Sequence, residues 1–287
     1  MLEPVNTCDL LSVQGEVQAA YAEMFPHGDR ELIPKIFGWA AAWFSGQYRD
    51  YQPIDAHYHD LEHTLQGILC MERLLRRRHQ HPSEPRLTQR MMELGLLAML
   101  THDTGYLKKR DDAEGTGAKY TLIHVDRSIE FAGELMLGHH FPAEEILAVQ
   151  NMICCTGVNV KLENVRFQSP LERMVGFALG TSDLLGQMAA PDYVDKLPTL
   201  YTEFAEAARA SPDGRMKAGG FFSSAEDLMQ KTPLFWENYV WNKINRDFLG
   251  LYRFLNDPYP DGPNDYIDRI QTNIARLRRE LAAQGRR

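Results

Sequence analysis

Residues 91–106 read MMELGLLAMLTHDTGY, and positions 94–100 within this stretch are almost unbroken apolar. A helix that is apolar all round is buried in the core of a protein, so these residues predict a core helix. The helix ends in His102 and Asp103, followed by Gly105. Because a buried carboxylate without a partner is costly, Asp103 needs one, and a divalent metal ion, an arginine or a helix N-terminus would each serve.

Helical patterns continue on both sides of this core helix, whereas strand-like alternation between Gly and Pro turns is absent. The sequence therefore predicts an all-α protein. The expected helices lie at about 13–24, 30–46, 60–79, 86–102, 121–139, 143–155, 169–189, 191–210, 224–230, 233–255 and 263–283.

Three of the later helices carry a start signal in the sequence. Ser224 with Asp227 fits a capping box. Thr232–Pro233 and Gly262–Pro263 each read as an N-cap followed by proline at the first helical position. We expect a single domain over 1–287, with a core at about 57–190 and a C-terminal helical extension at 191–287 that could cap the site.

The composition is that of a globular protein with a large core. The 287 residues are 44% hydrophobic and 24% charged, and the net charge is −8. A negative charge argues against a general affinity for the nucleic acid backbone. The four cysteines form no CxxC pair, which indicates a reduced compartment. We see neither a signal peptide nor a run long enough to span a bilayer, so the expected location is cytoplasmic, without a membrane partner.

The segment HYHDLEHT, residues 57–64, opens the helix expected at 60–79. His59 and His63 are four residues apart and share one helix face. Leucines cluster on roughly the opposite face, so this helix is expected to be buried on two sides with its histidines directed into protein. Considered alone, the pair could be hydrogen-bonded, partly buried histidines without a further role.

A second buried carboxylate is expected at Asp183, which lies in the mostly apolar helical stretch LERMVGFALGTSDLLGQM, residues 171–188. Asp183 could cap a neighbouring helix or bind a metal ion. Taken together, His63, His102, Asp103 and Asp183 offer two imidazoles and two carboxylates. Such a set suits a divalent ion with positions left open for water and substrate.

The four residues, in this order, resemble the H…HD…D pattern of the HD superfamily of metal-dependent phosphohydrolases. The segment YHDLEH, residues 58–63, is similar to the YHNxxH motif of the cyclic nucleotide phosphodiesterases in that superfamily, and HDTGY resembles the HDxG form of bacterial members. The resemblance covers about residues 57–188. It departs at Asp60, where the phosphodiesterases have asparagine, and at Tyr106–Leu107, where a further histidine is missing.

The resemblance implies a phosphodiesterase-like helical bundle, with additional C-terminal helices, around a metal centre held by His63, His102, Asp103 and Asp183. It implies that His59 and Asp103 are catalytic, with His59 protonating the leaving oxygen. The cofactor would be one or two divalent ions (Mn, Mg, Fe or Zn). The substrate would be a small nucleotide-like phosphodiester or phosphomonoester. The glutamine that holds the base in the phosphodiesterases has no evident counterpart, so nucleotide specificity is left open.

Three further residues are candidates for the same site. His124 lies in the helix that follows the pair His102–Asp103. Other superfamily members place an extra ligand in that helix, so His124 could bind a second ion. Lys108 and Lys109 lie in the loop that follows the pair His102–Asp103 and could bind a substrate phosphate. A solvated loop is the commoner role of such a charge run.

Two other functions remain open from the sequence. The same superfamily includes diiron oxygenases, whose extra histidines leave a role for His124. A non-catalytic HD domain that senses a nucleotide is the other alternative, although all four ligands are present. A homodimer is left open as well.

Overall fold

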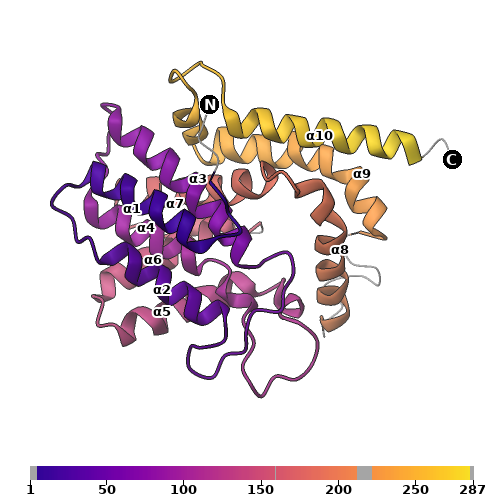
Figure 1. The fold of residues 1–287 in the computed structure, drawn as a ribbon, viewed down its shortest axis with the longest axis horizontal. Coiled ribbons are helices and arrows are strands. Elements are labelled where there is room, and N and C mark those ends of the chain that lie inside the picture. Colours follow the sequence, from indigo (N-terminus) through magenta and orange to yellow (C-terminus); the bar gives the residue numbers. More distant parts are fainter. Residues whose placement is uncertain (1–4, 159, 212–221, 285–287) are drawn as a thin grey trace.

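The computed structural model describes residues 5–158, 160–211 and 222–284, and this part of the chain is built from helices (Figure 1). Within it, the one extended pairing is an isolated bridge between Tyr51 and Lys109. The all-α prediction is confirmed. The α-helices are α1 (Leu10–Met24), α2 (Leu32–Phe44), α3 (Leu61–Gln80), α4 (Gln89–Thr101), α5 (His124–Gly138), α6 (Ala143–Ile153), α7 (Pro170–Met188), α8 (Tyr193–Ala210), α9 (Ala225–Phe235) and α10 (Asp265–Gln284).

Shorter helical turns connect these elements. Turns of 3-10 helix lie at Thr104–Tyr106, Gly117–Tyr120, Cys154–Thr156, Leu162–Asn164 and Leu251–Leu255. Two π-helical turns, Trp236–Val240 and Lys243–Asp247, follow α9. The single helix predicted at 233–255 is therefore replaced by the end of α9, two π-helical turns and one turn of 3-10 helix.

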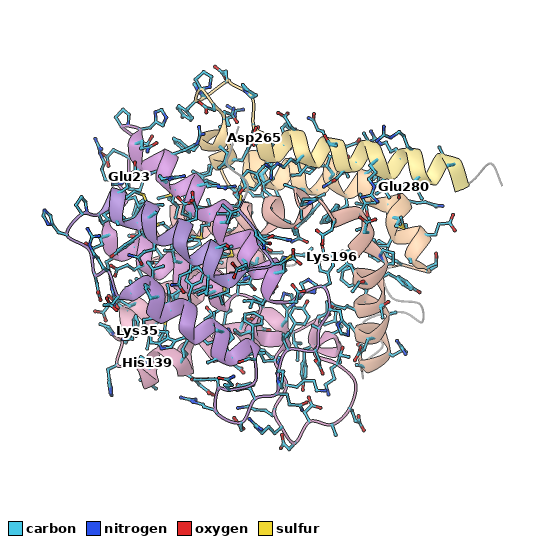
Figure 2. All side chains as sticks on the ribbon, viewed as in Figure 1. Glu23, Lys35, His139, Lys196, Asp265 and Glu280 are labelled. Carbon is cyan, nitrogen blue, oxygen red and sulfur yellow. The ribbon has the colours of Figure 1, made fainter. Side chains whose placement is uncertain are left out.

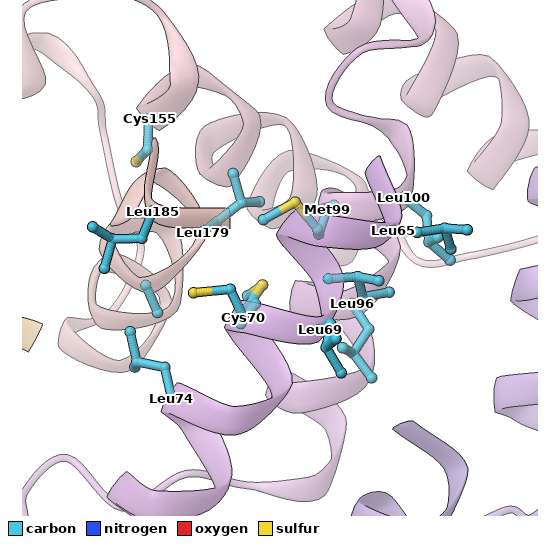
Figure 3. Packing of buried hydrophobic residues seen from close by; sticks show 14 of the residues in the cluster. Leu65, Leu69, Cys70, Leu74, Leu96, Met99, Leu100, Cys155, Leu179 and Leu185 are labelled. Carbon is cyan, nitrogen blue, oxygen red and sulfur yellow. The ribbon is translucent and has the colours of Figure 1, made fainter. Parts of the chain in front are cut away.

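Helix α3 lies inside the bundle, where it packs against α1, α4 and α7. Leu65 and Leu69 of α3, Leu96 of α4, and Leu179 and Leu185 of α7 belong to one buried cluster (Figure 3). Removing apolar surface from water contributes about 25 cal/mol per Å², so this cluster holds the three helices in fixed relative positions. All three also carry candidate site residues, either within the helix or at its end.

Helices α3 and α7 cross at close range because α7 has a glycine at the contact. A Cβ atom at Gly186 would lie 2.8 Å from the carbonyl oxygen of Gln66 and 3.0 Å from the backbone nitrogen of Gly67. A larger residue would push the two backbones apart. The close crossing places the N-terminal part of α3 beside the C-terminal part of α7.

Side-chain caps fix where these helices begin. Asp60 accepts a hydrogen bond from the backbone nitrogen of His63 at 2.9 Å, and Ser169 accepts one from Glu172 at 3.0 Å. Such a cap contributes about 1 kcal/mol. The Asp60 that departs from the phosphodiesterase motif is thus the N-cap of the helix that carries His63.

The prediction that Thr232–Pro233 starts a helix is wrong. Helix α9 runs through both residues, and the Thr232 hydroxyl donates to the carbonyl oxygen of Leu228 at 2.8 Å instead of capping. The buried side chains of Leu228 and Trp236 anchor the segment on either side of the proline, and this packing outweighs the cost of the missing N–H. The N-cap predicted at Ser224 is confirmed, since its hydroxyl accepts from the Asp227 nitrogen at 3.0 Å, but the Asp227 carboxylate accepts from the nitrogen of Ser223, one residue earlier than in a capping box, at 2.8 Å.

The start predicted at Gly262–Pro263 is displaced as well. The side-chain oxygen of Asn264 accepts hydrogen bonds from the backbone nitrogens of Tyr266 and Ile267, at 3.1 and 3.2 Å. Asn264 is therefore the cap of α10, and the helix begins at Asp265. Asparagine is among the best N-cap residues, and its amide here takes the role assigned to the glycine–proline pair.

The C-terminal extension consists of α8, α9 and α10, with α9 and α10 side by side along one edge of the molecule and α8 descending beside the bundle (Figure 1). All four cysteines are free thiols. In the described ranges, no helix has both the length and the apolar character needed to cross a bilayer.

Candidate metal centre

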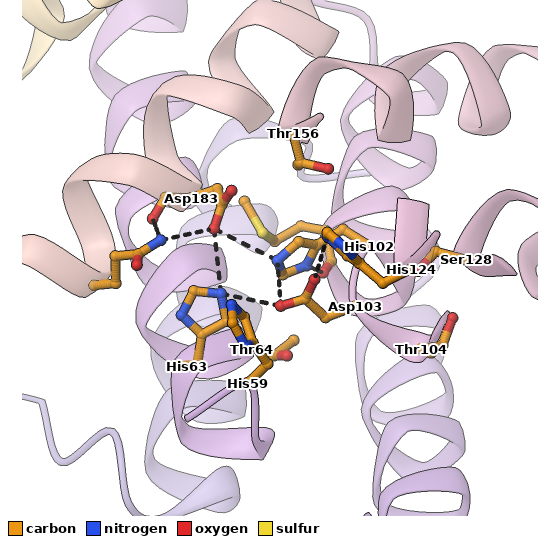
Figure 4. Close-up of polar contacts among 12 residues, drawn as sticks. His59, His63, Thr64, His102, Asp103, Thr104, His124, Ser128, Thr156 and Asp183 are labelled. Carbon is orange, nitrogen blue, oxygen red and sulfur yellow. Dashed lines mark hydrogen bonds and ion pairs between the residues drawn. The ribbon is translucent and has the colours of Figure 1, made fainter. Parts of the chain in front are cut away.

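The ends and middles of three helices meet at one buried cluster of polar atoms (Figure 4). His63 comes from the first turn of α3, His102 and Asp103 from the end of α4, and Asp183 from the middle of α7. The Nε2 atom of His63 lies 3.1 Å from Asp103 Oδ2 and 3.2 Å from Asp183 Oδ1. The Nε2 atom of His102 lies 3.2 Å from Asp103 Oδ2 and 3.6 Å from Asp183 Oδ1.

These separations fit the edges of a metal coordination sphere. Ligand atoms about 2.1 Å from an ion lie about 3.0–3.4 Å from their neighbours in octahedral or tetrahedral arrangements. Although they lie close together, His102 Nε2 and Asp103 Oδ2 are buried and have no hydrogen-bond partner. A buried polar atom without a partner is costly. The residues present therefore fit a divalent ion, and His63, His102 and Asp103 form a buried group that could hold one.

Hydrogen bonds to the backbone direct two imidazoles toward the cluster. His102 Nδ1 lies 2.8 Å from the carbonyl oxygen of Met99, and His124 Nδ1 lies 2.6 Å from that of Thr121. A carbonyl oxygen only accepts, so each Nδ1 carries a proton, and in the neutral ring the lone pair is then on Nε2. Both rings are thus held in the tautomer that a metal ligand requires.

Charge is distributed unevenly in the cluster. Burial lowers the pKa of His63, but Asp103 and Asp183 outweigh it and raise that pKa to about 9. Burial raises the pKa of Asp103, yet His102 and His63 hold it well below its usual range. The same two carboxylates also raise the pKa of His102 well above its usual range, against the effect of burial, so without a metal ion protonation of both imidazoles is favoured and the carboxylates are ionised.

His59, the candidate acid, is held by a residue that the sequence did not point to. Its Nδ1 atom lies 2.6 Å from Glu203 Oε2, and the other Glu203 oxygen accepts from the backbone nitrogen of Tyr58 at 2.7 Å. The His59 ring stacks on Tyr106 at 4.5 Å between centroids and lies 5.5 Å from the His63 ring. His59 thus stands beside the cluster with Nε2 directed away from Glu203.

Glu203 belongs to α8 and is 4% exposed. One signal for it exists in the sequence. It lies among the buried positions Leu197 and Ala207 of an otherwise amphipathic helix, and a carboxylate on an apolar face needs a partner. The pattern could have identified Glu203 as unusual, but it could not have identified His59 as the partner.

His124 faces one carboxylate oxygen of Asp103, while His63 and His102 face the other. Its Nε2 atom is 3.7 Å from Asp103 Oδ1, and its ring stacks on Tyr106 at 4.8 Å. Burial lowers the pKa of His124, so the ring is neutral near pH 7. Its role as a ligand of a second ion stays a prediction, with a position and protonation state that suit it.

Both candidate phosphate-binding lysines have protein partners. The Lys108 ammonium donates to Asp55 Oδ2 at 3.1 Å and to the Gly115 carbonyl. The Lys109 ammonium donates to Asp50 at 2.8 Å and lies over the Tyr51 ring. A role in binding substrate stays a prediction for both.

Gly105, two positions after Asp103, lies where no side chain fits. A Cβ atom at Gly105 would lie 1.9 Å from the carbonyl oxygen of His124. The Gly105 nitrogen donates to the Ser128 hydroxyl at 2.8 Å. Any side chain at this position would displace the start of α5, and with it His124.

Comparison with known proteins gives a family. The sequence model of the Npun_R2479-like family matches residues 10–254. The chain belongs to the Npun_R2479-like family. The match includes every residue of the metal centre as well as His59 and Glu203, so the site lies within the part shared with this Npun_R2479-like family. A comparison with curated proteins finds no significant match.

Proposed function

We propose that this protein is a metal-dependent phosphohydrolase that cleaves a phosphodiester or phosphomonoester in a small, nucleotide-like molecule. The observation that carries the proposal is the convergence of His63, His102, Asp103 and Asp183 on one buried point, with His59 beside it. The resemblance to the HD superfamily, which rests on these same residues, supports it.

His63, His102, Asp103 and Asp183 would hold the ion. A divalent ion bound there supplies water activation and neutralises charge on the phosphoryl oxygens. His59 carries a proton toward the leaving oxygen, and the bond between its Nδ1 atom and Glu203 orients the ring. Tyr106, stacked on the same ring, keeps that face free of water.

Three lysines near the centre are paired with carboxylates. Lys196 of α8, which faces the bundle in Figure 2, pairs with Glu62 at 2.7 Å and Asp192 at 3.1 Å. Lys108 and Lys109 are paired as described above. These three lysines are therefore engaged within the protein, and the metal ion would supply much of the attraction for a substrate phosphate.

The experiment that tests the proposal is phosphate-ester hydrolysis by protein loaded separately with Mn²⁺, Mg²⁺, Fe²⁺ or Zn²⁺. Bis(p-nitrophenyl) phosphate, p-nitrophenyl phosphate and nucleoside monophosphates serve as probes. We expect turnover that requires metal and is removed by a chelator. Absence of turnover with every ion would contradict the proposal.

The diiron oxygenase is the second candidate, and the position of His124 beside Asp103 favours it. A mixed-valent iron signal in electron paramagnetic resonance, together with oxygen consumption and no ester hydrolysis, would select this alternative.

Metal binding should release protons. A ligand imidazole must give up its extra proton, and the pKa of His63 is raised to about 9. Protons therefore compete with the ion, so we expect apparent affinity to rise from pH 6 to 9. Calorimetric titration with Mn²⁺ in buffers of different ionisation enthalpy measures the protons released. Affinity independent of pH over this range would show that His63 is not a ligand.

A further inference from the structure

One nitrogen of the metal centre has no partner on the side away from the ion. His63 uses Nε2 to face Asp103 and Asp183, and Figure 4 shows its other ring nitrogen directed away from them. This Nδ1 atom is buried and has no hydrogen-bond partner. His102 and His124 differ, because a backbone carbonyl accepts from each of their Nδ1 atoms. His63 therefore lacks a hydrogen-bond acceptor for Nδ1, the ring nitrogen that would not bind the metal ion, whereas metal-binding histidines almost always have such an acceptor.

A small polar cavity lies against the same ring. His63 lines it together with Tyr58, Gln66, Gln187, Asp192 and Lys196. Its volume is about 10 Å³, which is close to what one water molecule needs, and such a water requires two to four polar partners. The cavity is too small for a nucleotide-like substrate, so it is not the substrate pocket.

Most polar groups around the cavity are already engaged. The Gln187 oxygen accepts from the Tyr58 hydroxyl at 2.9 Å, and the Gln187 nitrogen donates to the Asp183 carbonyl at 3.1 Å. Lys196 is held by two carboxylates. The nitrogen of Gln66 points to Glu62, at 3.4 Å, which leaves the Gln66 oxygen as an acceptor on the helix face that carries His63.

We propose that this cavity binds one ordered water molecule, which accepts the Nδ1–H hydrogen bond of His63 and donates to the side-chain oxygen of Gln66. Gln66 is then a positioning residue for His63, acting through the water. A histidine that binds metal through Nε2 keeps a proton on Nδ1, and the water fixes the ring in that state. The water site depends on the cavity alone, and its effect on metal binding rests on the proposed function.

The first test is a high-resolution crystal structure of the unaltered protein, both metal-free and loaded with Mn²⁺. We expect a water peak in both, about 2.7–3.2 Å from His63 Nδ1 and from the Gln66 oxygen. A dry cavity would overturn the proposal, as would direct bonding of a protein oxygen to Nδ1.

The second test compares Gln66→Met, which keeps the shape but removes the acceptor, with Gln66→Glu, which keeps an oxygen. We expect the methionine variant to bind Mn²⁺ about 10–100-fold more weakly, and the glutamate variant to stay within a few-fold of the unaltered protein. The Nδ1–H proton of His63, followed by ¹H–¹⁵N nuclear magnetic resonance, should exchange faster in Gln66→Met only. Unchanged affinity and exchange in Gln66→Met would contradict the role of Gln66.

The two proposals can fail separately. If the unaltered protein binds no metal, the phosphohydrolase proposal falls. The water peak and the exchange of the Nδ1 proton still test the water site in the metal-free protein.

Discussion

Asp103→Ala should leave the purified protein almost free of metal. One Asp103 oxygen lies 3.1 and 3.2 Å from the His63 and His102 nitrogens, and the other lies 3.7 Å from His124. Asp103 is therefore the group common to the main cluster and the expected second site. Loss of an outer partner of a metal ligand costs about 10–100-fold in affinity, and loss of a direct ligand should cost more. Metal analysis by mass spectrometry measures the content, and ester hydrolysis should fall to background.

The matched control is Asp126→Ala, which changes an exposed aspartate in the first turn of α5. This variant should keep its metal and its activity. Because removing one partner of a buried charge pair can cost about 3–5 kcal/mol, Asp103→Asn, which keeps the shape, is the second variant. Circular dichroism confirms that each variant is folded. Full metal content in folded Asp103→Asn and Asp103→Ala would show that Asp103 is not a ligand, and no metal in any protein after reloading would refute the centre.

The helices that carry the metal centre could be predicted from local patterns. Helices α3, α4 and α7 are each long and apolar over more than one face, and their predicted bounds differ by only a few residues from those observed. The order of His63, His102, Asp103 and Asp183 along these helices then indicates a shared site. Burial supports the prediction physically, because polar groups on such helices need partners inside the protein.

Local signals failed where packing at a distance decides the structure. Thr232–Pro233 has the sequence of a helix start, yet α9 continues through it with Leu228 and Trp236 buried on either side. At α10 the cap is Asn264, a better N-cap residue than Gly262. At Thr232–Pro233 the local preference is worth only a few kcal/mol, and tertiary contacts outweigh it, whereas at α10 the stronger of two local caps decides where the helix begins.

Glu203 shows most clearly which part of the site local sequence patterns could not predict. It lies 144 positions after His59 in the chain, and the two side chains meet only because α8 folds back onto the segment before α3. No motif connects them. The C-terminal extension therefore supplies a group to the candidate site, which the sequence allowed only as a general expectation that this part could cap it.

Replacing His59 with alanine should lower kcat by about 10²–10⁴-fold, the range for loss of a general acid, while the metal content stays unchanged. His59 lies beside the cluster but is not among the atoms that converge on it, since its Nδ1 atom is bonded to Glu203. His57→Ala is the matched control, because His57 is exposed and lies two positions away. Steady-state kinetics with Mn²⁺-loaded protein measures the loss, and an equal loss in His57→Ala would show a general disturbance of this segment.

The leaving group distinguishes a proton donor from a structural residue. An alkoxide must be protonated as it departs, whereas p-nitrophenolate departs readily without a proton. His59→Ala should therefore slow hydrolysis of alkyl phosphate esters much more than that of nitrophenyl esters. Glu203→Gln removes the carboxylate oxygen that holds His59 Nδ1 at 2.6 Å, so it should lower kcat for alkyl phosphate esters in the same direction as His59→Ala. Equal losses for both classes of ester would assign His59 to substrate positioning, because a group that only orients the substrate has no dependence on the basicity of the leaving oxygen.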